Sequence, residues 1–188
     1  MTVTTSNPQA TFIHIPKNAG TSITHWLISY TNTSQPMEKV HGGKHADQYR
    51  VEKFLRQRNQ TLGFTFCVVR NPWDRLVSTY HYYIKRGQIN PKKLSFDDFI
   101  KGKWKEGNKW GCSRKQQHQY YYDMDIILRY ENLEEDFKQI QDFYGIKKDL
   151  GTKNTSKHKD YKSYYNQERI DIVAEHCKKD IKIFNYDF

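Results

Sequence analysis

The sequence has few cysteines and no long apolar run. Its three cysteines, Cys67, Cys112 and Cys177, show no C-x-x-C spacing, so the sequence supports neither a zinc ribbon nor a disulfide framework. Residues 1–11 lack the basic start and apolar core of a signal peptide, and no run approaches the ~18 apolar residues that a membrane-spanning helix needs. We therefore expect a protein of a reducing compartment, the cytoplasm.

Internal repeats, low-complexity tracts and domain linkers are also absent from the sequence. Its 188 residues fit one domain, since domains commonly hold roughly 100–200 residues, and we expect a single domain over residues 1–188 with residues 1–10 flexible. Aromatic residues reach 15%, so rings should build much of the core. The 31 Lys and Arg against 21 Asp and Glu give a net charge of +10, which attracts polyanions, anionic cofactors or acidic membrane surfaces.

The most informative stretch is residues 12–23, Phe-Ile-His-Ile-Pro-Lys-Asn-Ala-Gly-Thr-Ser-Ile. Its apolar start predicts a short strand, Pro and Gly predict a turn, and the apolar residues that follow at helical spacing predict a helix. Backbone N–H groups and the helix dipole at a helix N-terminus favour a phosphate or sulfate. Lys17 adds a positive charge, and Thr21 and Ser22 add hydroxyl donors, so the turn predicts an oxyanion site.

A second turn from strand to helix follows the apolar run Phe64–Val69. Asn71 is a suitable N-cap and Pro72 a suitable first helical residue, which predicts a helix to about Lys85. Two such turns in succession imply a βαβ crossover and a parallel sheet, whose ligands bind at the carboxyl ends of the strands. Lys17 and Arg70 both lie at such ends.

The other predicted elements are coarser. They are a loop over 31–43, helices over 46–58, 131–145 and 166–180, a short helix from Ser95, and a strand over 126–130. Trp104 and Trp110 are expected to pack in the core. Asp74 and Arg75 are expected to form ion pairs on the surface of their helix.

The two turns resemble motifs of a known family. The first does not match the Walker pattern G-x-x-x-x-G-K-[ST], because Lys17 precedes Gly20. His-Ile-Pro-Lys-x-x-Gly-Thr-Ser instead resembles the 5′-phosphosulfate loop of carbohydrate O-sulfotransferases that use 3′-phosphoadenosine 5′-phosphosulfate (PAPS). Residues 70–80, Arg-Asn-Pro-Trp-Asp-Arg-Leu-Val-Ser-Thr-Tyr, resemble the 3′-phosphate motif of the same enzymes. The similarity, to heparan sulfate 2-O-sulfotransferases and to bacterial and phage members, spans most of residues 11–188 and implies an α/β fold: a P-loop-like three-layer α/β/α arrangement with a short parallel sheet.

The resemblance also implies roles for individual residues. The 5′-phosphosulfate is expected to bind Lys17, Asn18, Ala19, Gly20, Thr21 and Ser22. The 3′-phosphate is expected to bind Arg70 and Ser78. A late basic loop that contains Ser156 and Lys157 is expected to fold over the nucleotide. Lys17 is also expected to stabilise the leaving phosphate oxygen as 3′-phosphoadenosine 5′-phosphate (PAP) forms. Such in-line transfer requires no metal.

A base must take the proton of the acceptor hydroxyl, and histidine suits this role because its ordinary pKa is about 6.5. His45 is the first candidate because it lies between the two motifs, as the catalytic histidine does in the 2-O-sulfotransferases that this chain resembles. His41 is the second. A metal site from both is disfavoured, since Gly42 and Gly43 break the helix that would align them.

We therefore predict a PAPS-dependent sulfotransferase that acts on a hydroxyl, most simply of a saccharide. One alternative is a P-loop kinase, which would need a Walker lysine and a Mg²⁺-binding Asp. Another is a basic nucleic-acid-binding module, which would explain the charge and the 14 tyrosines but not two separate anion motifs.

Overall fold

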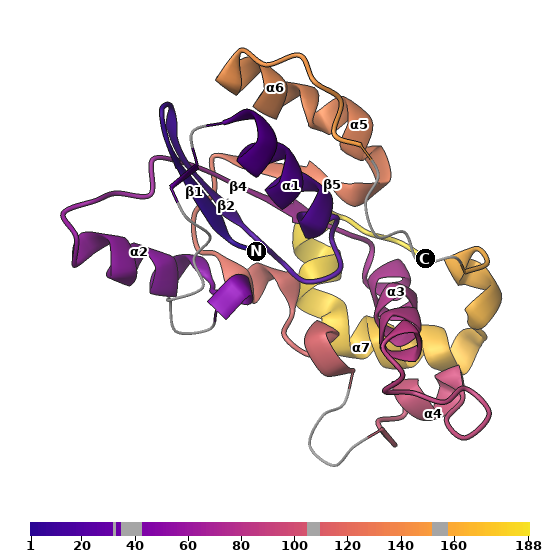
Figure 1. The fold of residues 1–188 in the computed structure, drawn as a ribbon. Helices are drawn as coiled ribbons and strands as arrows, with labels where there is room; N and C mark the ends of the chain where they lie inside the picture. Colours follow the sequence, from indigo (N-terminus) through magenta and orange to yellow (C-terminus); the bar gives the residue numbers. More distant parts are fainter. Residues whose placement is uncertain (32, 35–42, 105–109, 152–157) are drawn as a thin grey trace. The chain divides into compact units, whose positions relative to one another are not determined.

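The computed structural model of the chain describes residues 1–31, 33–34, 43–104, 110–151 and 158–188 (Figure 1). Backbone contacts divide the chain into two compact units. The first unit is Met1–Val69 with Gln119–Asn154, and the second unit is Arg70–His118 with Thr155–Phe188. The single domain expected from the sequence stays a prediction.

The first unit holds a five-stranded sheet with the strand order β3-β1-β2-β4-β5. Strands β2, β4 and β5 are parallel, while β1 is antiparallel to both β2 and β3. The strands are β1 (Val3–Ser6), β2 (Gln9–Ile13), β3 (Thr33–Ser34), β4 (Phe64–Val69) and β5 (Ile126–Arg129). The predicted α/β class with a short parallel sheet is therefore confirmed, and an antiparallel edge is added to it.

The start of the chain differs from the expectation of a flexible end. Val3–Ser6 form β1, and the side chain of Val3 is fully buried. β-branched threonines suit a strand, and their hydroxyls find partners: Thr2 donates to the carbonyl of Ala46 at 3.2 Å, and Thr5 to that of Pro8 at 2.6 Å. The strand was not predicted because its sequence is polar, and the structure accommodates this polarity through hydrogen bonds of the threonine hydroxyls.

Helices α1 (Gly20–Tyr30), α5 (Leu133–Asp136) and α6 (Lys138–Tyr144) share one core with the sheet (Figure 1). Trp26 of α1 meets the ring of Phe137 edge-on with centroids 5.1 Å apart, and Phe12 and Phe66 of neighbouring strands pack at 5.1 Å. The single helix predicted over 131–145 is wrong in one respect, because it is interrupted at the buried Phe137. The remaining long helix of this unit, α2 (Gln48–Arg56), agrees with its prediction.

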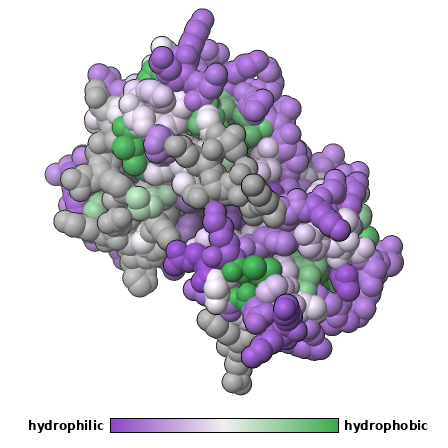
Figure 2. Space-filling model, turned by 45° about the vertical axis from the view of Figure 1, so that its right-hand side comes forward, coloured by the Kyte–Doolittle hydropathy of each residue, from purple (hydrophilic) through white to green (hydrophobic). Residues whose placement is uncertain are grey.

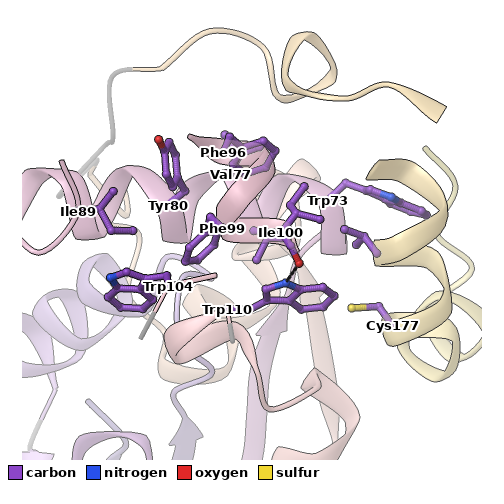
Figure 3. Close-up of a cluster of buried hydrophobic side chains, with 12 residues drawn as sticks. Trp73, Val77, Tyr80, Ile89, Phe96, Phe99, Ile100, Trp104, Trp110 and Cys177 are labelled. Atoms are coloured by element: carbon purple, nitrogen blue, oxygen red, sulfur yellow. Dashed lines mark hydrogen bonds between the residues drawn. The ribbon is translucent and has the colours of Figure 1, made fainter. Parts of the chain in front are cut away.

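The second unit consists of helices α3 (Pro72–Lys85), α4 (Phe96–Ile100) and α7 (Gln167–Phe184) with short 3₁₀ turns. Figure 3 shows its aromatic core, in which Trp104 and Trp110 are buried as predicted and the indole of Trp110 donates to the carbonyl of Ile100 at 2.7 Å. The predicted caps are also present, since Asn71 accepts from the N–H of Trp73 and Ser95 forms a capping box. Helix α7 runs to Phe184, beyond the predicted end.

Hydrophilic residues cover most of the face drawn in Figure 2, and hydrophobic residues form small separate patches there. Within the described ranges, none of the helices combines the length and the apolar character that crossing a membrane requires.

Candidate functional site

The loop between β2 and α1 has a backbone that non-glycine residues rarely adopt. Lys17 has φ 72° and Ala19 has φ 55°, both in the left-handed region. Such residues cost about 1–3 kcal/mol each and gather at ligand sites. Left-handed residues beside a helix start also turn successive N–H groups toward a common point, which is an anion-binding geometry.

The first turn of α1 carries no side-chain cap. Ala19 is its N-cap residue, and no acidic residue lies in its first turn. The other described helices of similar length, α2, α3 and α7, are capped by Asp47, Asn71 and Asn166. A helix start without a cap presents N–H groups and a partial positive charge to an anion.

The side chains of this loop divide between the fold and the loop surface. Asn18 is buried and donates from Nδ2 to the carbonyl of Val68 at 2.7 Å, which ties the loop to the carboxyl end of β4. Ser22 is also buried, Lys17 is partly exposed and Thr21 is exposed. The loop is thus fixed by Asn18, while Lys17 and Thr21 reach its surface.

Gly20 is required by the close approach of His14. A Cβ atom on Gly20 would lie 2.0 Å from Cδ2 and Nε2 of the His14 ring. The ring is almost fully buried, stacks on Phe12 with centroids 5.9 Å apart, and contacts the amino group of Met1 through Nδ1. No role was predicted for His14 from the sequence, although an ionisable ring on the same strand face as Phe12, just before the loop, is a signal for one.

His45 lies beside His14. It ends the 3₁₀ turn Gly43–His45, and the two rings meet edge-on with centroids 4.7 Å apart. Nδ1 of His45 is 3.3 Å from the carbonyl oxygen of His14. Because a carbonyl only accepts hydrogen bonds, this contact places a proton on Nδ1, and in the neutral ring the lone pair is then on Nε2. The first unit therefore brings His45, His14 and Gly20 together, while His41 lies outside the described residues.

In the second unit, Arg70 is held by its backbone. Its N–H donates to Oε1 of Gln117 at 2.9 Å, and its carbonyl accepts from Nε2 of Gln117 at 2.8 Å. Asp180 accepts from the N–H groups of Gln117 at 2.7 Å and His118 at 3.0 Å. This support was not predicted from the sequence, although Asp180 follows Cys177 by three residues on the apolar face of its helix.

The guanidinium of Arg70 is paired with Asp74. Nε and Nη2 donate to the two carboxylate oxygens at 2.8 and 2.9 Å, and the side chains are only 6% and 14% exposed. The expectation that Asp74 and Arg75 form surface ion pairs is therefore wrong. Arg75 is buried and donates to the carbonyls of Lys115 and Cys112, because its long side chain points into the unit instead of along the helix surface.

Ser78 is buried on α3, about two helical turns after Asn71. The loop of residues 17–22 belongs to the first unit, and Arg70 and Ser78 belong to the second. Ser156 and Lys157 lie outside the described residues. Among the residues that the structure describes, His, Cys, Asp and Glu form no group of three that could hold a metal ion.

Known proteins with similar sequences or structures were found among sulfotransferases and in one uncharacterized protein. A sequence model described as the sulfotransferase family matches residues 1–187. An uncharacterized protein of Archaeoglobus fulgidus is 35% identical over 99 residues, which are 52% of this chain and 81% of that protein. Among solved structures, a sulfotransferase from Alicyclobacillus acidocaldarius is 12% identical with a TM-score of 0.38; the match covers 71% of this chain and 59% of that one. Because the family match extends over nearly the whole sequence, the chain belongs to the sulfotransferase family.

Proposed function

We propose that this sulfotransferase moves the sulfuryl group of PAPS to a hydroxyl of a saccharide. The observation that carries the proposal is the uncapped, left-handed loop at the start of α1, which lies in one unit with His45. An enzyme of this kind needs an oxyanion site for its donor and a base for its acceptor, and these two features offer both.

The loop fits the 5′ end of such a donor. When bound, PAPS supplies a sulfuryl group on a phosphate leaving group. The N–H groups of Gly20 and Thr21 at the start of α1 hold negative charge there, whereas the N–H of Ser22 donates to the carbonyl of Ala19 at 2.9 Å, and the hydroxyl of Thr21 adds a donor. Lys17 neutralises the charge that develops on the leaving oxygen, and it stands on a loop whose backbone is fixed by Asn18.

His45 acts as the base. With its proton on Nδ1, directed to the carbonyl of His14, Nε2 has the lone pair that accepts the proton of the acceptor hydroxyl. The edge of the His14 ring limits how the His45 ring can turn. His41 remains the alternative base.

Arg70 and Ser78 recognise the 3′-phosphate. The backbone of Arg70 is fixed by Gln117, and its side chain offers a planar guanidinium. A phosphate binds the N–H groups of a guanidinium more strongly than a neutral acceptor does. Ser156 and Lys157 remain proposed to cover the nucleotide. The three cysteines are free thiols, which fits a reducing compartment such as the cytoplasm.

The test is the melting temperature of the purified protein with PAP, with 5′-AMP, which lacks the 3′-phosphate, and with ATP and Mg²⁺. At a hundred times its dissociation constant PAP should add about 2.7 kcal/mol to the free energy of unfolding, or about 5–10 °C in this size class. 5′-AMP and ATP should shift it much less. Equal shifts with ATP and PAP would contradict the donor assignment and favour a kinase, and a larger shift with nonspecific DNA would favour a nucleic-acid-binding module.

A further inference from the structure

Helix α7 carries a carboxylate on its buried face. Its buried residues are Val173, Cys177, Asp180 and Phe184, and Asp180 is fully buried. A buried carboxylate is costly unless hydrogen-bond donors surround it. Buried ionic groups can often be replaced by well-packed apolar residues without loss of stability, and the neighbours of Asp180 on this face include apolar residues. The charge of Asp180 therefore needs a reason other than packing.

The donors that bind Asp180 belong to two consecutive residues. Oδ2 accepts from the backbone N–H of Gln117 at 2.7 Å, and Oδ1 accepts from the backbone N–H of His118 at 3.0 Å. Nδ1 of His118 lies 2.6 Å from the same Oδ1. Hydrogen bonds to a charged group are stronger than those between neutral groups. One side chain of α7 thus fixes the backbone of the segment that contains Gln117.

The side chain of Gln117 takes the place of a strand partner for Arg70. Strand β4 ends at Val69, and its register with β5 ends at the same residue. At Arg70 the backbone N–H donates to Oε1 of Gln117 at 2.9 Å, and the carbonyl accepts from Nε2 of Gln117 at 2.8 Å. Gln117 is fully buried. Two hydrogen bonds to one planar amide fix both the position and the orientation of the Arg70 backbone.

The position of the Arg70 guanidinium follows from this backbone and from Asp74. Nε and Nη2 donate to the carboxylate of Asp74, and the Arg70 side chain is only 6% exposed. Asp74 and Ser78 both lie on α3. Groups that bind a ligand must be placed to within about 0.5 Å. A shift of the Arg70 backbone would therefore move the guanidinium away from the point where it and Ser78 can bind one phosphate.

We propose that Gln117 and Asp180 are positioning residues for recognition of the 3′-phosphate of the donor. Asp180 fixes Gln117, and Gln117 holds Arg70 where its guanidinium meets the phosphate together with Ser78. The inference rests on the proposed function, because it needs Arg70 to bind the 3′-phosphate. It adds two residues that act through Arg70 to those that determine the selectivity for the donor.

The test is calorimetric titration of each variant with PAP and with 5′-AMP, which lacks the 3′-phosphate. Gln117→Met keeps the length of the side chain but removes both hydrogen bonds to Arg70. We expect PAP affinity to fall by about five- to tenfold in this variant, the value of roughly one hydrogen bond. In Asp180→Asn one of two acceptor oxygens is lost, so we expect a smaller loss of PAP affinity. Affinity for 5′-AMP should stay at the wild-type value in both variants, because this nucleotide has no group for Arg70 to bind.

Two controls separate positioning from a general loss of stability. Asp125 also holds a backbone with its carboxylate, since it accepts from the N–H and the hydroxyl of Thr65 at 2.7 and 2.8 Å, but it lies in the first unit. Asp125→Asn should lower the melting temperature and leave the ratio of PAP affinity to 5′-AMP affinity unchanged. In an Arg70→Ala background, Gln117→Met should cause no further loss of PAP affinity, because effects that pass through one contact are not additive.

An unchanged affinity ratio in the variants of Gln117 and Asp180 would overturn the proposal, as would additive effects of Gln117→Met and Arg70→Ala. Equal losses of affinity for both nucleotides would also overturn it, since they indicate damage to the whole site. Asp180→Asn alone decides the outcome if Gln117→Met does not fold. The wild type tests the proposed function separately: equal affinity for PAP and 5′-AMP there refutes the donor assignment, whereas a preference for PAP that the variants keep refutes only the positioning role.

Discussion

Helices α1 and α3 both begin just after a strand and beside a basic residue, but their first turns differ. The start of α1 has two left-handed residues and no side-chain cap. The start of α3 is capped by Asn71, and its arginine, Arg70, is paired with Asp74. The start of α1 thus has no side-chain cap, whereas the start of α3 has both a cap and an arginine that is paired with a carboxylate.

This difference suggests a division of work. An anion at α1 meets backbone N–H groups on a loop that the side chain of Asn18 fixes, which suits charge that appears only in the transition state. An anion at Arg70 must share a guanidinium with Asp74, which suits recognition of a group that stays unchanged through the reaction. Substitutions at the two helix starts and at the proposed base test this division.

His45→Ala should lower the rate of transfer by about 10²–10⁴, the usual contribution of a general base. PAP binding and the melting temperature should remain near those of the wild type, since the ring of His45 is only partly buried. Wild-type activity should fall toward acid pH, because protonated imidazole has no lone pair for the proton, and this acid limb should vanish in the variant. His25→Ala, an exposed histidine of α1, is the control; a full effect of His41→Ala instead would move the role to His41.

Lys17→Ala should lower the turnover number by about 10²–10³, as loss of one oxyanion donor does. Its affinity for PAP should change far less, because Lys17 is proposed to act on charge that develops during transfer. Single-turnover kinetics and PAP titration separate the two quantities. A loss confined to PAP affinity would show that this lysine only binds the nucleotide.

Arg70→Ala should show the opposite pattern. We expect PAP affinity to fall by about 10- to 100-fold, the value of a charged hydrogen-bonded contact, with a smaller effect on turnover of the saturated enzyme. Affinity for 5′-AMP should not change, since it lacks the 3′-phosphate. Arg70→Lys keeps the charge but not the planar fork, so a partial loss there would indicate that geometry contributes. Unchanged PAP affinity in Arg70→Ala would contradict the role of the second motif.

Gly20→Ala should lower the free energy of unfolding by about 1–3 kcal/mol, the range for overpacking. The added Cβ would meet the His14 ring at 2.0 Å, so the ring must move. The double variant with His14→Ala should be more stable than the sum of the two single effects predicts, because the smaller residue makes room. Additive effects in denaturant unfolding would exclude this contact as the reason for the glycine.

The sequence predicted those features whose signals are local. Strand β4 and helix α3 match their predicted bounds, because the apolar run, the cap Asn71 and Pro72 stand next to one another. The turn before α1 was found in the same way. These signals act within a few residues, so a single sequence contains them.

The missed features depend on residues far apart in the chain. β1 exists because it pairs with β2 and β3, and its polar composition gave no apolar pattern. Asp180 reaches Gln117, and Gln117 reaches Arg70, across distances that no periodicity shows. The role of His14 likewise follows from packing against Gly20 and His45. Such contacts depend on tertiary packing, which a local sequence pattern does not predict.

The smallest expected effect concerns Asp74, the residue that distinguishes the second site from the first. In Asp74→Asn the carboxylate no longer balances Arg70, whose side chain is only 6% exposed, so the melting temperature without ligand should fall. The 3′-phosphate of PAP then supplies the missing negative charge and meets no competing carboxylate. PAP affinity should therefore rise several-fold, less than about tenfold, and the PAP-induced melting shift should grow. Glu175→Gln removes one charge from an exposed pair with Lys178 in the same unit and should change neither quantity. Weaker PAP binding in Asp74→Asn would mean that Asp74 mainly orients Arg70 for the phosphate, and the contrast between a site whose cation is balanced by a carboxylate and one without a side-chain cap would no longer hold.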